Sequence, residues 1–147
     1  MKDKGRTRIR RGFTMVELMA VLIILGLLAA LVVGNFVGRV DDARVKVTKA
    51  SLRQLHTAVN QFHMDTGRWP EPEEGLTVLV QQPADVTNWP PGGYIETVEV
   101  PKDGWGRDFI YERYPDIGRP FVIKSLGADG QEEGEGYDTD LYSTDAS

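Results

Sequence analysis

Before the first proline, Pro70, the apolar residues follow two helix-like patterns. Residues 13–33 form an apolar run of about 21 residues in which Glu17 is the single charged side chain. A run of this length is sufficient to cross a bilayer as a helix. Beyond Arg39, apolar residues recur mostly every three or four positions, which predicts a helix with one buried face. These residues are Val40, Ala43, Val47, Leu52, Leu55, Val59 and Phe62.

The two patterns can belong to one helix, because no proline interrupts them. We therefore expect a long helix over residues 13–64, with its membrane segment at about 13–33. Gly34 and Asn35 lower the helix propensity just past the apolar run, so the helix could melt locally there when subunits assemble. The sequence Gly67-Arg68-Trp69-Pro70 ends the helix, because glycine suits a left-handed cap and proline cannot continue a helix.

Residues 65–147 predict a small globular head after the long helix. A second, short helix is expected over residues 73–81, where three apolar residues form a narrow edge. Residues 100–111 predict a turn that leads into a strand, and a second strand follows at 121–124. The predicted fold class is α+β, in which a long amino-terminal helix packs on a small antiparallel sheet.

Charge is distributed unevenly along the chain. Six basic residues and one acidic residue give residues 1–12 a net charge of about +5, and the whole chain carries −5. Basic residues before a membrane segment hold that end in the cytoplasm, so the acidic remainder is expected across the membrane. The acidity of that remainder disfavours a role in nucleic-acid binding. The chain has no cysteine, so no disulfide stabilises the head.

Glu17 requires an explanation, because an ionised carboxylate in hydrocarbon costs at least a few kcal/mol. An ordinary secretory signal, cleaved near Ala29 and Ala30, is disfavoured by the length of the run and by the early carboxylate. A plain uncleaved anchor does not explain why Gly12, Phe13 and Glu17 occur together. A further alternative is that Glu17 complements the positive end of its own helix and reaches the interface.

The sequence Arg-Gly-Phe-Thr-Met-Val-Glu-Leu at residues 11–18 resembles the processing site of type IV pilin-like proteins. The resemblance implies that a prepilin peptidase removes residues 1–12 by cutting after Gly12, and that Phe13 is then N-methylated. It also implies that Glu17 meets the amino terminus of an adjacent subunit and sets the register of a filament. Pairing of Glu17 with the Phe13 amine of its own chain remains an alternative.

Two further segments resemble the type II secretion major pseudopilins within this family. Residues 100–111 carry the Pro, Asp, Trp-Gly and Tyr of one family motif. The chain departs from that motif by having Gly104 where proline is usual and Phe109 in place of a tyrosine. Residues 125–140 resemble the calcium loop of the same proteins.

The acidic tail predicts a calcium site for a physical reason as well. Residues 125–140 hold six carboxylates and four glycines, and crowded carboxylates repel one another unless a cation gathers them. The spacing does not match an EF-hand, and a solvated, disordered tail is the alternative. A head of about 80 residues without cysteine also benefits from a metal. The resemblance implies the carbonyl of Leu126 and the side chains of Asp129 and Asp138 as ligands, with Asp140 as a further candidate.

The resemblance covers residues 11–140 and implies a structural function. The expected protein is a major subunit of a periplasmic pseudopilus that drives export of folded proteins through a type II secretion system. It would be a single-pass protein of the bacterial inner membrane with its head in the periplasm. Its expected partners are further copies of itself, minor pseudopilins, the inner-membrane assembly platform, prepilin peptidase and membrane lipid.

Three alternatives to this interpretation remain. A type IV pilus major subunit shares the helix, but the cysteine pair common at its carboxyl end is absent here. A membrane-anchored periplasmic binding module that never polymerises and a minor pseudopilin at the fibre tip are the others. An enzyme is not expected, because no His, Cys or Ser constellation is present; His56 and His63 are interpreted as surface residues.

Overall fold

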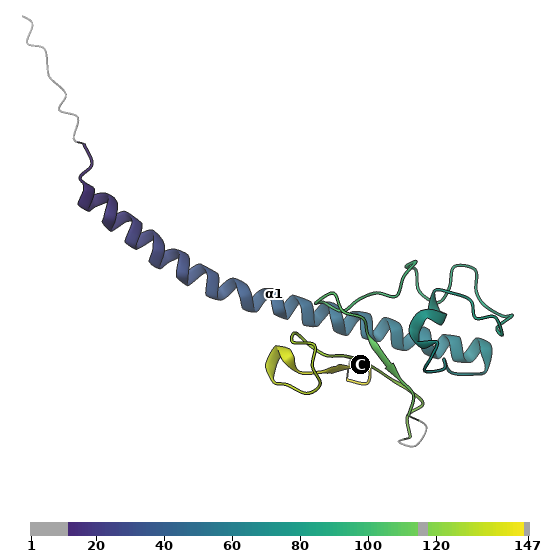
Figure 1. Cartoon of the computed structure of the whole chain (residues 1–147). Helices are drawn as coiled ribbons and strands as arrows, with labels where there is room; N and C mark the ends of the chain where they lie inside the picture. Colours follow the sequence, from purple (N-terminus) through teal and green to yellow (C-terminus); the bar gives the residue numbers. More distant parts are fainter. Residues whose placement is uncertain (1–11, 115–117, 146–147) are drawn as a thin grey trace, which may run out of the picture. The chain divides into compact units, whose positions relative to one another are not determined.

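The computed structural model describes residues 12–114 and 118–145, without the side chains of residues 31–37. It divides into two compact units at the Gly38–Arg39 boundary. The helix α1 runs through both units, and the remaining elements belong to the second unit (Figure 1). In chain order the elements are α1 (Met15–Thr66), η1 (Gly75–Leu79), β1 (Ile110–Glu112), β2 (Val122–Ser125), η3 (Gly136–Asp138) and β3 (Leu141–Tyr142).

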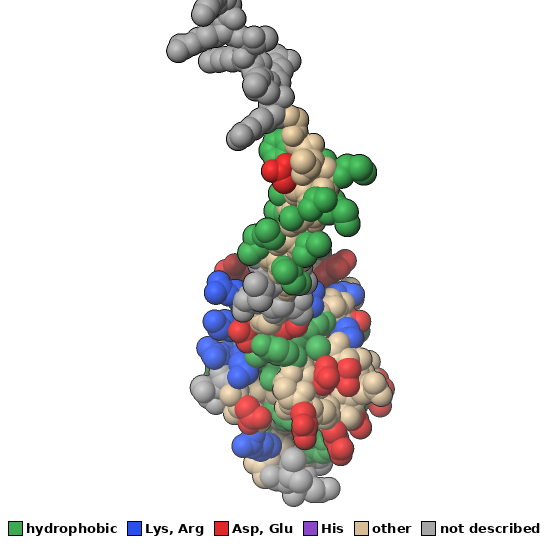
Figure 2. Space-filling model, turned by 90° about the vertical axis from the view of Figure 1, so that its left-hand side faces the viewer, with side chains coloured by type: hydrophobic (Ala, Val, Ile, Leu, Met, Phe, Trp, Pro, Cys, Tyr) green, Lys and Arg blue, Asp and Glu red, His purple; other side chains and the backbone are tan. Residues whose placement is uncertain are grey.

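The first unit contains the apolar part of α1. The helix begins two residues later and ends two residues later than predicted, at Met15 and Thr66. Its large apolar side chains between Met15 and Leu28 are exposed, and Figure 2 shows them around the visible sides of this segment. Within the part of the chain that the structure describes, no helix is both long enough and apolar enough to cross a membrane. The structure does not describe the side chains of residues 31–33, at the end of the predicted span, or that of Asn35, which follows Gly34.

The second half of α1 forms one wall of the head's hydrophobic core. Leu52, Leu55, Val59 and Phe62 lie on one face of the helix and are completely buried. Their main partners from the rest of the head include Leu79, Phe121 and Ile123. Each such side chain contributes about 1.5–3 kcal/mol when fully buried, so this face anchors the head.

The predicted buried face is shorter than expected at its amino-terminal end. Val40 is 41% exposed and Val47 is 55% exposed, so the upstream part of the apolar stripe is not covered by the head. Burial begins at Thr48, whose hydroxyl donates to the carbonyl of Arg44, at 2.8 Å, and which is fully buried. The prediction that the whole stripe packs on the head is therefore wrong for Val40, Ala43 and Val47.

Among the described residues the sheet has three antiparallel strands in the order β1-β2-β3. Ile110 pairs with Lys124 between β1 and β2, and Ser125 pairs with Leu141 between β2 and β3. The predicted α+β class with a small antiparallel sheet is confirmed. The strand β3 was not predicted, because two residues are too few to show an alternating pattern.

The predicted second helix over residues 73–81 is a short 3-10 helix instead. Gly75 at its start has a φ of +55°, a conformation outside the right-handed helical region. The turn before it is closed by hydrogen bonds from the amides of Glu74 and Gly75 to the carbonyl of Glu71, at 3.0 and 2.9 Å. Only η1 therefore forms, and it still buries Leu76 and Leu79 against the core.

The loop at residues 103–107 docks closely on α1. The amide of Gly104 donates to the hydroxyl of Thr48 at 2.8 Å. A Cβ atom at Gly104 would lie 2.7 Å from Cα of Arg44 and closer still to its carbonyl oxygen, so this position requires glycine. The buried carboxylate of Asp103 accepts from the amides of Trp105 and Arg107, at 3.0 and 2.8 Å, and fixes the turn.

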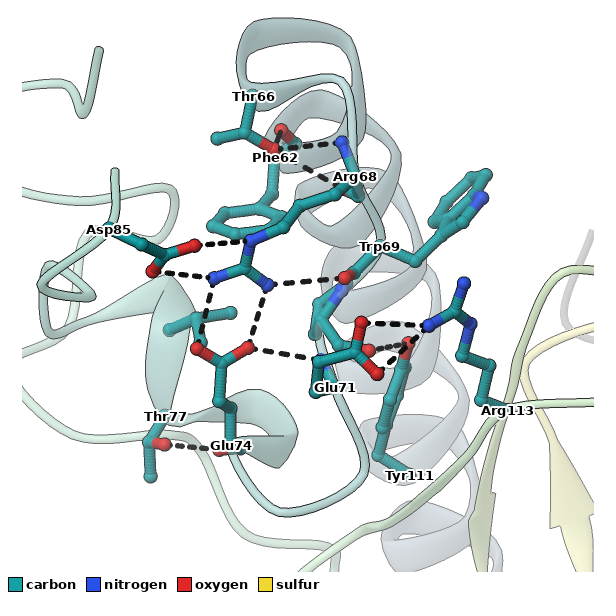
Figure 3. A network of polar contacts seen from close by, with 12 residues as sticks. Phe62, Thr66, Arg68, Trp69, Glu71, Glu74, Thr77, Asp85, Tyr111 and Arg113 are labelled. Atoms are coloured by element: carbon teal, nitrogen blue, oxygen red, sulfur yellow. Dashed lines mark hydrogen bonds and ion pairs between the residues drawn. The ribbon is translucent and has the colours of Figure 1, made fainter. Parts of the chain in front are cut away.

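An ion-pair network closes the end of the head where α1 stops (Figure 3). The guanidinium of Arg68 donates to both carboxylate oxygens of Glu74, at 2.7 and 2.9 Å, and to both of Asp85, at 2.9 and 3.0 Å. It also lies 5.3 Å from the centre of the Phe62 ring. Arg68 thereby joins the end of α1 to η1 and to the following loop.

Neighbouring contacts extend this network to β1. Arg113 contacts both oxygens of the Glu71 carboxylate at 2.9 Å, and the hydroxyl of Tyr111 donates to the carbonyl of Pro70 at 3.0 Å. Burial raises the pKa of Tyr111 to about 12, so it donates this hydrogen bond throughout the physiological pH range. Polar contacts thus join the end of α1, η1 and β1 without a disulfide.

We predict that Gly104→Ala lowers the free energy of unfolding of the full-length protein in detergent by about 1–3 kcal/mol, because the added methyl group overpacks the contact with α1. Chemical denaturation followed by tryptophan fluorescence measures this. Gly106→Ala is the comparison, since its φ of +83° makes alanine strained but nothing lies within 4 Å of a Cβ there. If Gly104→Ala unfolds like the wild type, the close contact with Arg44 is not a constraint.

We also predict that the contribution of Arg68 to the stability of the head depends on pH. Hydrogen bonds from Arg68 lower the pKa of Glu74 and of Asp85 below their ordinary values of 4.5 and 3.8. Carboxylates with lowered pKa values stabilise the fold above their unfolded pKa, and this stability is lost as the pH falls through the folded pKa. The difference in Tm between wild type and Arg68→Met should therefore be several degrees at pH 7 and shrink below about pH 4.

The measurement is a series of thermal melts from pH 7 to pH 3 with a chelator present, so that no metal contributes. Arg113→Met removes a more exposed ion pair and should change the Tm less at every pH. A difference for Arg68→Met that stays constant across this range would contradict the assigned role of the two carboxylates.

Candidate functional site

The predicted processing and assembly residues lie at the start of α1. Gly12 and Phe13 precede the helix, and the Phe13 side chain is 78% exposed. The Glu17 carboxylate accepts two hydrogen bonds from Thr14, at 2.9 Å from its amide and 3.1 Å from its hydroxyl. The Thr14 hydroxyl in turn accepts from the amide of Glu17 at 3.2 Å. This reciprocal arrangement is a capping box.

The capping box gives Glu17 a local role within its own chain. Two of the amides that a helix leaves without partners, those of Thr14 and Glu17, are satisfied by side chains. These contacts agree with the alternative in which Glu17 complements the start of its own helix. A contact of Glu17 with a neighbouring subunit stays a prediction. The sequence did contain the signal, because Thr and Glu three residues apart are the capping-box spacing.

The acidic tail folds back on itself as a compact loop. The amide of Ala128 donates to the carbonyl of Tyr137 at 2.9 Å, and the amide of Gly130 donates to the carbonyl of Leu126 at 3.0 Å. A Cβ atom at Gly127 would lie 2.7 Å from the Asp138 carbonyl group, so the two ends of the loop are in close contact. The structure therefore brings the backbone of Gly127 against the backbone of Asp138.

Arg107 holds this loop from outside it. Its guanidinium donates to the carbonyls of Gly127 and Ala128, at 2.6 and 2.8 Å. A Cβ atom at Gly130 would meet the same guanidinium at 2.7 Å, so the loop wraps closely around it. Nothing in the sequence pattern pointed to Arg107, because its partners are backbone carbonyls 20 residues away or more.

Two further contacts connect the loop to the rest of the head. The hydroxyl of Tyr137 donates to the carboxylate of Asp42 on α1 at 3.0 Å. The ammonium group of Lys124 on β2 contacts Glu132 of the loop at 2.8 Å and Glu112 on β1 at 3.0 Å. These two carboxylates raise the pKa of Lys124, so it stays charged. The loop is thus attached to α1 and to the sheet.

The predicted calcium ligands are only partly gathered. One oxygen of Asp140, Oδ2, accepts from the amide of Glu133 at 3.2 Å, whereas Oδ1 is buried and has no hydrogen-bond partner among the described residues. Asp129 is exposed and accepts from the amide of Gln131 at 3.0 Å, which closes a local turn. Among residues that the structure describes, no three His, Cys, Asp or Glu side chains lie close enough to hold a metal together.

The available donors still have the chemistry that calcium requires. Backbone carbonyls and carboxylates are hard oxygen ligands, and a buried carboxylate oxygen without a partner is costly unless something satisfies it. Asp140 carries such an oxygen, and it lies two residues after Asp138 in the sequence. Among the predicted ligands, Asp140 therefore has the oxygen that a cation could satisfy, whereas Asp129 already accepts a hydrogen bond within a local turn.

The two histidines are not simple surface residues, contrary to the interpretation from sequence. Nδ1 of His56 lies 3.2 Å from the hydroxyl of Ser143, and its ring packs on Phe121 with centroids 4.8 Å apart. His63 stacks on Trp69 with ring centroids 3.8 Å apart. Both rings pack against the head, and among the described residues neither lies in a group of metal-ligating side chains.

Comparison with known families gives two matches along the chain. Residues 35–144 match the family described as "Type II secretion system (T2SS), protein G". Residues 7–33 match the "Prokaryotic N-terminal methylation motif", a segment that includes Gly12, Phe13 and Glu17. Together the two matches cover the apolar helix, the head and the acidic loop.

Individual relatives agree with the family matches. The type II secretion system core protein G of Pseudomonas aeruginosa is 38% identical over 141 residues, which cover 94% of this chain and 97% of that protein. The protein of the same name from Vibrio cholerae is 38% identical and covers 92% of each chain. The crystal structure of the major pseudopilin from the type 2 secretion system of enterohaemorrhagic Escherichia coli is also similar. It is 30% identical, has a TM-score of 0.57, and covers 74% of this chain and 92% of that one.

The long helix, the small antiparallel sheet and the amino-terminal motif thus occur together with a family match over most of the chain. The chain therefore belongs to the type II secretion system protein G family, and it is a major pseudopilin, a structural subunit of type II secretion and not an enzyme.

Proposed function

We propose that this chain polymerises into the periplasmic pseudopilus that drives folded proteins through a type II secretion system. The observation that carries this proposal is the family match over residues 35–144 together with the methylation motif at 7–33. The match favours a pseudopilin over a type IV pilus subunit. The other proposed partners are minor pseudopilins, the inner-membrane assembly platform and prepilin peptidase.

The apolar start of α1 is proposed to anchor the protein in the inner membrane, with the head in the periplasm. Large apolar side chains from Met15 to Leu28 are between 46% and 83% exposed, with no polar face among them except Glu17. A helix that is apolar on all sides needs either lipid or other apolar helices around it. Lipid surrounds it before assembly, and neighbouring copies of the same helix surround it in the fibre.

Processing after Gly12 would create an amine at Phe13, close to the capping box. Both donors of Thr14 use one oxygen of Glu17, Oε2, and no other donor among the described residues binds Oε1, which can therefore accept from a neighbouring subunit. In the fibre that donor is proposed to be the methylated amine of a neighbouring subunit. The charge pair would neutralise Glu17 in an apolar environment, where an unpaired carboxylate is costly.

Calcium is proposed to stabilise the acidic loop. The Leu126 carbonyl and the Asp138 and Asp140 carboxylates would hold the ion, and Asp129 would join only if its local turn opened. The buried Oδ1 of Asp140 without a partner supports this proposal. A bound divalent cation supplies positive charge that offsets the repulsion among the carboxylates of this loop.

We predict that Glu17→Ala leaves processing intact but prevents assembly. The substitution removes the proposed counter-ion of the neighbouring amine, whereas the cut site at Gly12 is unchanged. Mass spectrometry should find the variant beginning at Phe13 with one added methyl group, as in the wild type. The amount of sheared fibre from cells that overexpress the full chain should fall at least tenfold.

Glu17→Gln is the matched control, because it can keep the hydrogen bonds from Thr14 but carries no charge. It should fail to assemble as Glu17→Ala does if the charge pair is what matters. Normal fibres from either variant, or a native protein that begins at Met1, would contradict the proposed assembly. A binding module that never polymerises would give no fibre from the wild type either.

We predict that calcium stabilises the head and that chelation removes this effect. With free calcium at a hundred times its Kd, the linkage contributes about 2.7 kcal/mol, which raises the Tm. Melts of the purified protein with millimolar calcium and with chelator measure the difference. Asp140→Asn should lose most of the shift, whereas Asp108→Asn, outside the loop and paired with Lys102, should retain it. An unchanged Tm of the wild type in chelator would contradict the site.

A further inference from the structure

The head carries a basic groove at a distance from the acidic loop. It has a volume of about 550 Å³ and lies between the α1 residues 53–60, the segment 119–121 and the residues after β3. Arg53 and Arg119 are exposed at its edges, and the described residues that line it include no carboxylate. The groove therefore offers positive charge to an acidic partner.

The floor of the groove is fixed by contacts already described for His56. Its ring lies on Phe121 and contacts the hydroxyl of Ser143, which also accepts a hydrogen bond from the amide of Ile123 at 3.2 Å. Ser143 is itself 5% exposed, so β2 and β3 hold the floor in place. A groove with a fixed floor and charged edges can recognise a short acidic segment without rearrangement.

The acidic loop of the same chain has side chains that match this groove. Glu133 and Glu135 are exposed, and among the described residues neither forms an ion pair. Hydrogen bonds hold the backbone at Glu133 and at the residue between the two, from the Glu133 amide to Asp140 and from the Thr139 hydroxyl to the carbonyl of Gly134 at 3.3 Å. Figure 2 shows acidic and basic side chains gathered mainly on opposite sides of the visible face of the head.

The attachment of the loop to α1 and the groove lie at different levels of the helix. The loop is attached to α1 at Asp42 through Tyr137, and the groove lies at the level of His56. Fourteen helical residues separate the two levels, which is about 20 Å along the helix axis. Two different complementary patches on one subunit form a heterologous contact, and such contacts generate helical polymers when they do not close.

We propose that the groove lined by Arg53, His56 and Arg119 binds the Glu133–Glu135 segment of a second copy of this chain. This inference rests on the proposed polymerisation and specifies one contact between heads within it. The copy that supplies the loop is displaced by about 20 Å towards the carboxyl-terminal end of α1. Because exposed ion pairs contribute little affinity, the contact mainly selects the register of neighbouring subunits.

The test is a charge exchange in cells that assemble the full chain. Arg53→Glu with Arg119→Glu should reduce sheared fibre at least fivefold, and Glu133→Arg with Glu135→Arg should do the same. The four substitutions together restore opposite charges across the contact and should recover at least half of the wild-type amount. Melts of each purified variant establish that its head is folded.

A second measurement uses the absence of cysteine from the chain. Cells that coexpress a Thr57→Cys chain and a Glu133→Cys chain should give disulfide dimers, because Thr57 lines the groove. Neither chain alone should give them, and Thr77→Cys on η1 should not replace Thr57→Cys. Fibres that form normally with the reversed groove, or no dimer in assembled wild-type-like fibres, would overturn this contact. Absence of fibres from the wild type would instead overturn the proposed function.

Discussion

Burial of one face of α1 is the interaction on which the rest of the head depends. Leu52, Leu55, Val59 and Phe62 are removed from solvent by residues from η1 and from the sheet. No disulfide is available to hold these short elements, and each strand has four residues or fewer. Strands this short are not stable alone, so their position is set by the helix on which they pack.

The polar contacts of the head extend this packing to both of its ends. Near residue 44 the docking of Gly104 on α1 brings the Asp103 turn against the helix, and that turn positions Arg107, which holds the acidic loop. Where α1 ends, Arg68 joins the helix to η1 and the loop after it. The acidic loop is therefore anchored through a chain of contacts that begins at the helix. A metal in that loop would add to an arrangement that the protein itself already holds.

The parts of the fold that depend on local pattern could be predicted from the sequence, and those that depend on long-range contacts could not. Apolar periodicity and the absence of proline predicted the long helix, and Gly67 and Pro70 predicted its end. Periodicity alone did not show that the head covers α1 only from Thr48 onward, because that depends on where the loop at Gly104 docks. Arg68 and Arg107 were also missed, since their partners lie up to 21 residues away in sequence.

The candidate site shows the same division. Gly12, Phe13 and Glu17 could be proposed because they form a short local motif, and the family match covers that segment. Their roles in processing and assembly stay predictions. The capping box of Thr14 and Glu17 was not predicted, although the spacing fits it, because the same carboxylate can also pair with an amine of its own or a neighbouring chain. In the acidic loop, composition predicted a cation site, but among the described residues the structure does not bring three carboxylates together. Asp140, the weakest candidate by resemblance, carries the buried oxygen without a partner, and Asp129 is used in a local turn.

The exposed surfaces of the chain differ in what they can contribute to assembly, either apolar contact between subunits or selection of their register. The apolar side chains of the first unit are proposed to contact neighbouring copies, but they are similar on all sides and select no register. Register needs features that occur once per subunit, and charged groups at fixed positions provide them. We propose that Glu17, the acidic loop and the basic groove are such groups. A polymer built from this chain therefore needs a head that is rigid, because a mobile loop would lose the positional information that its charges carry.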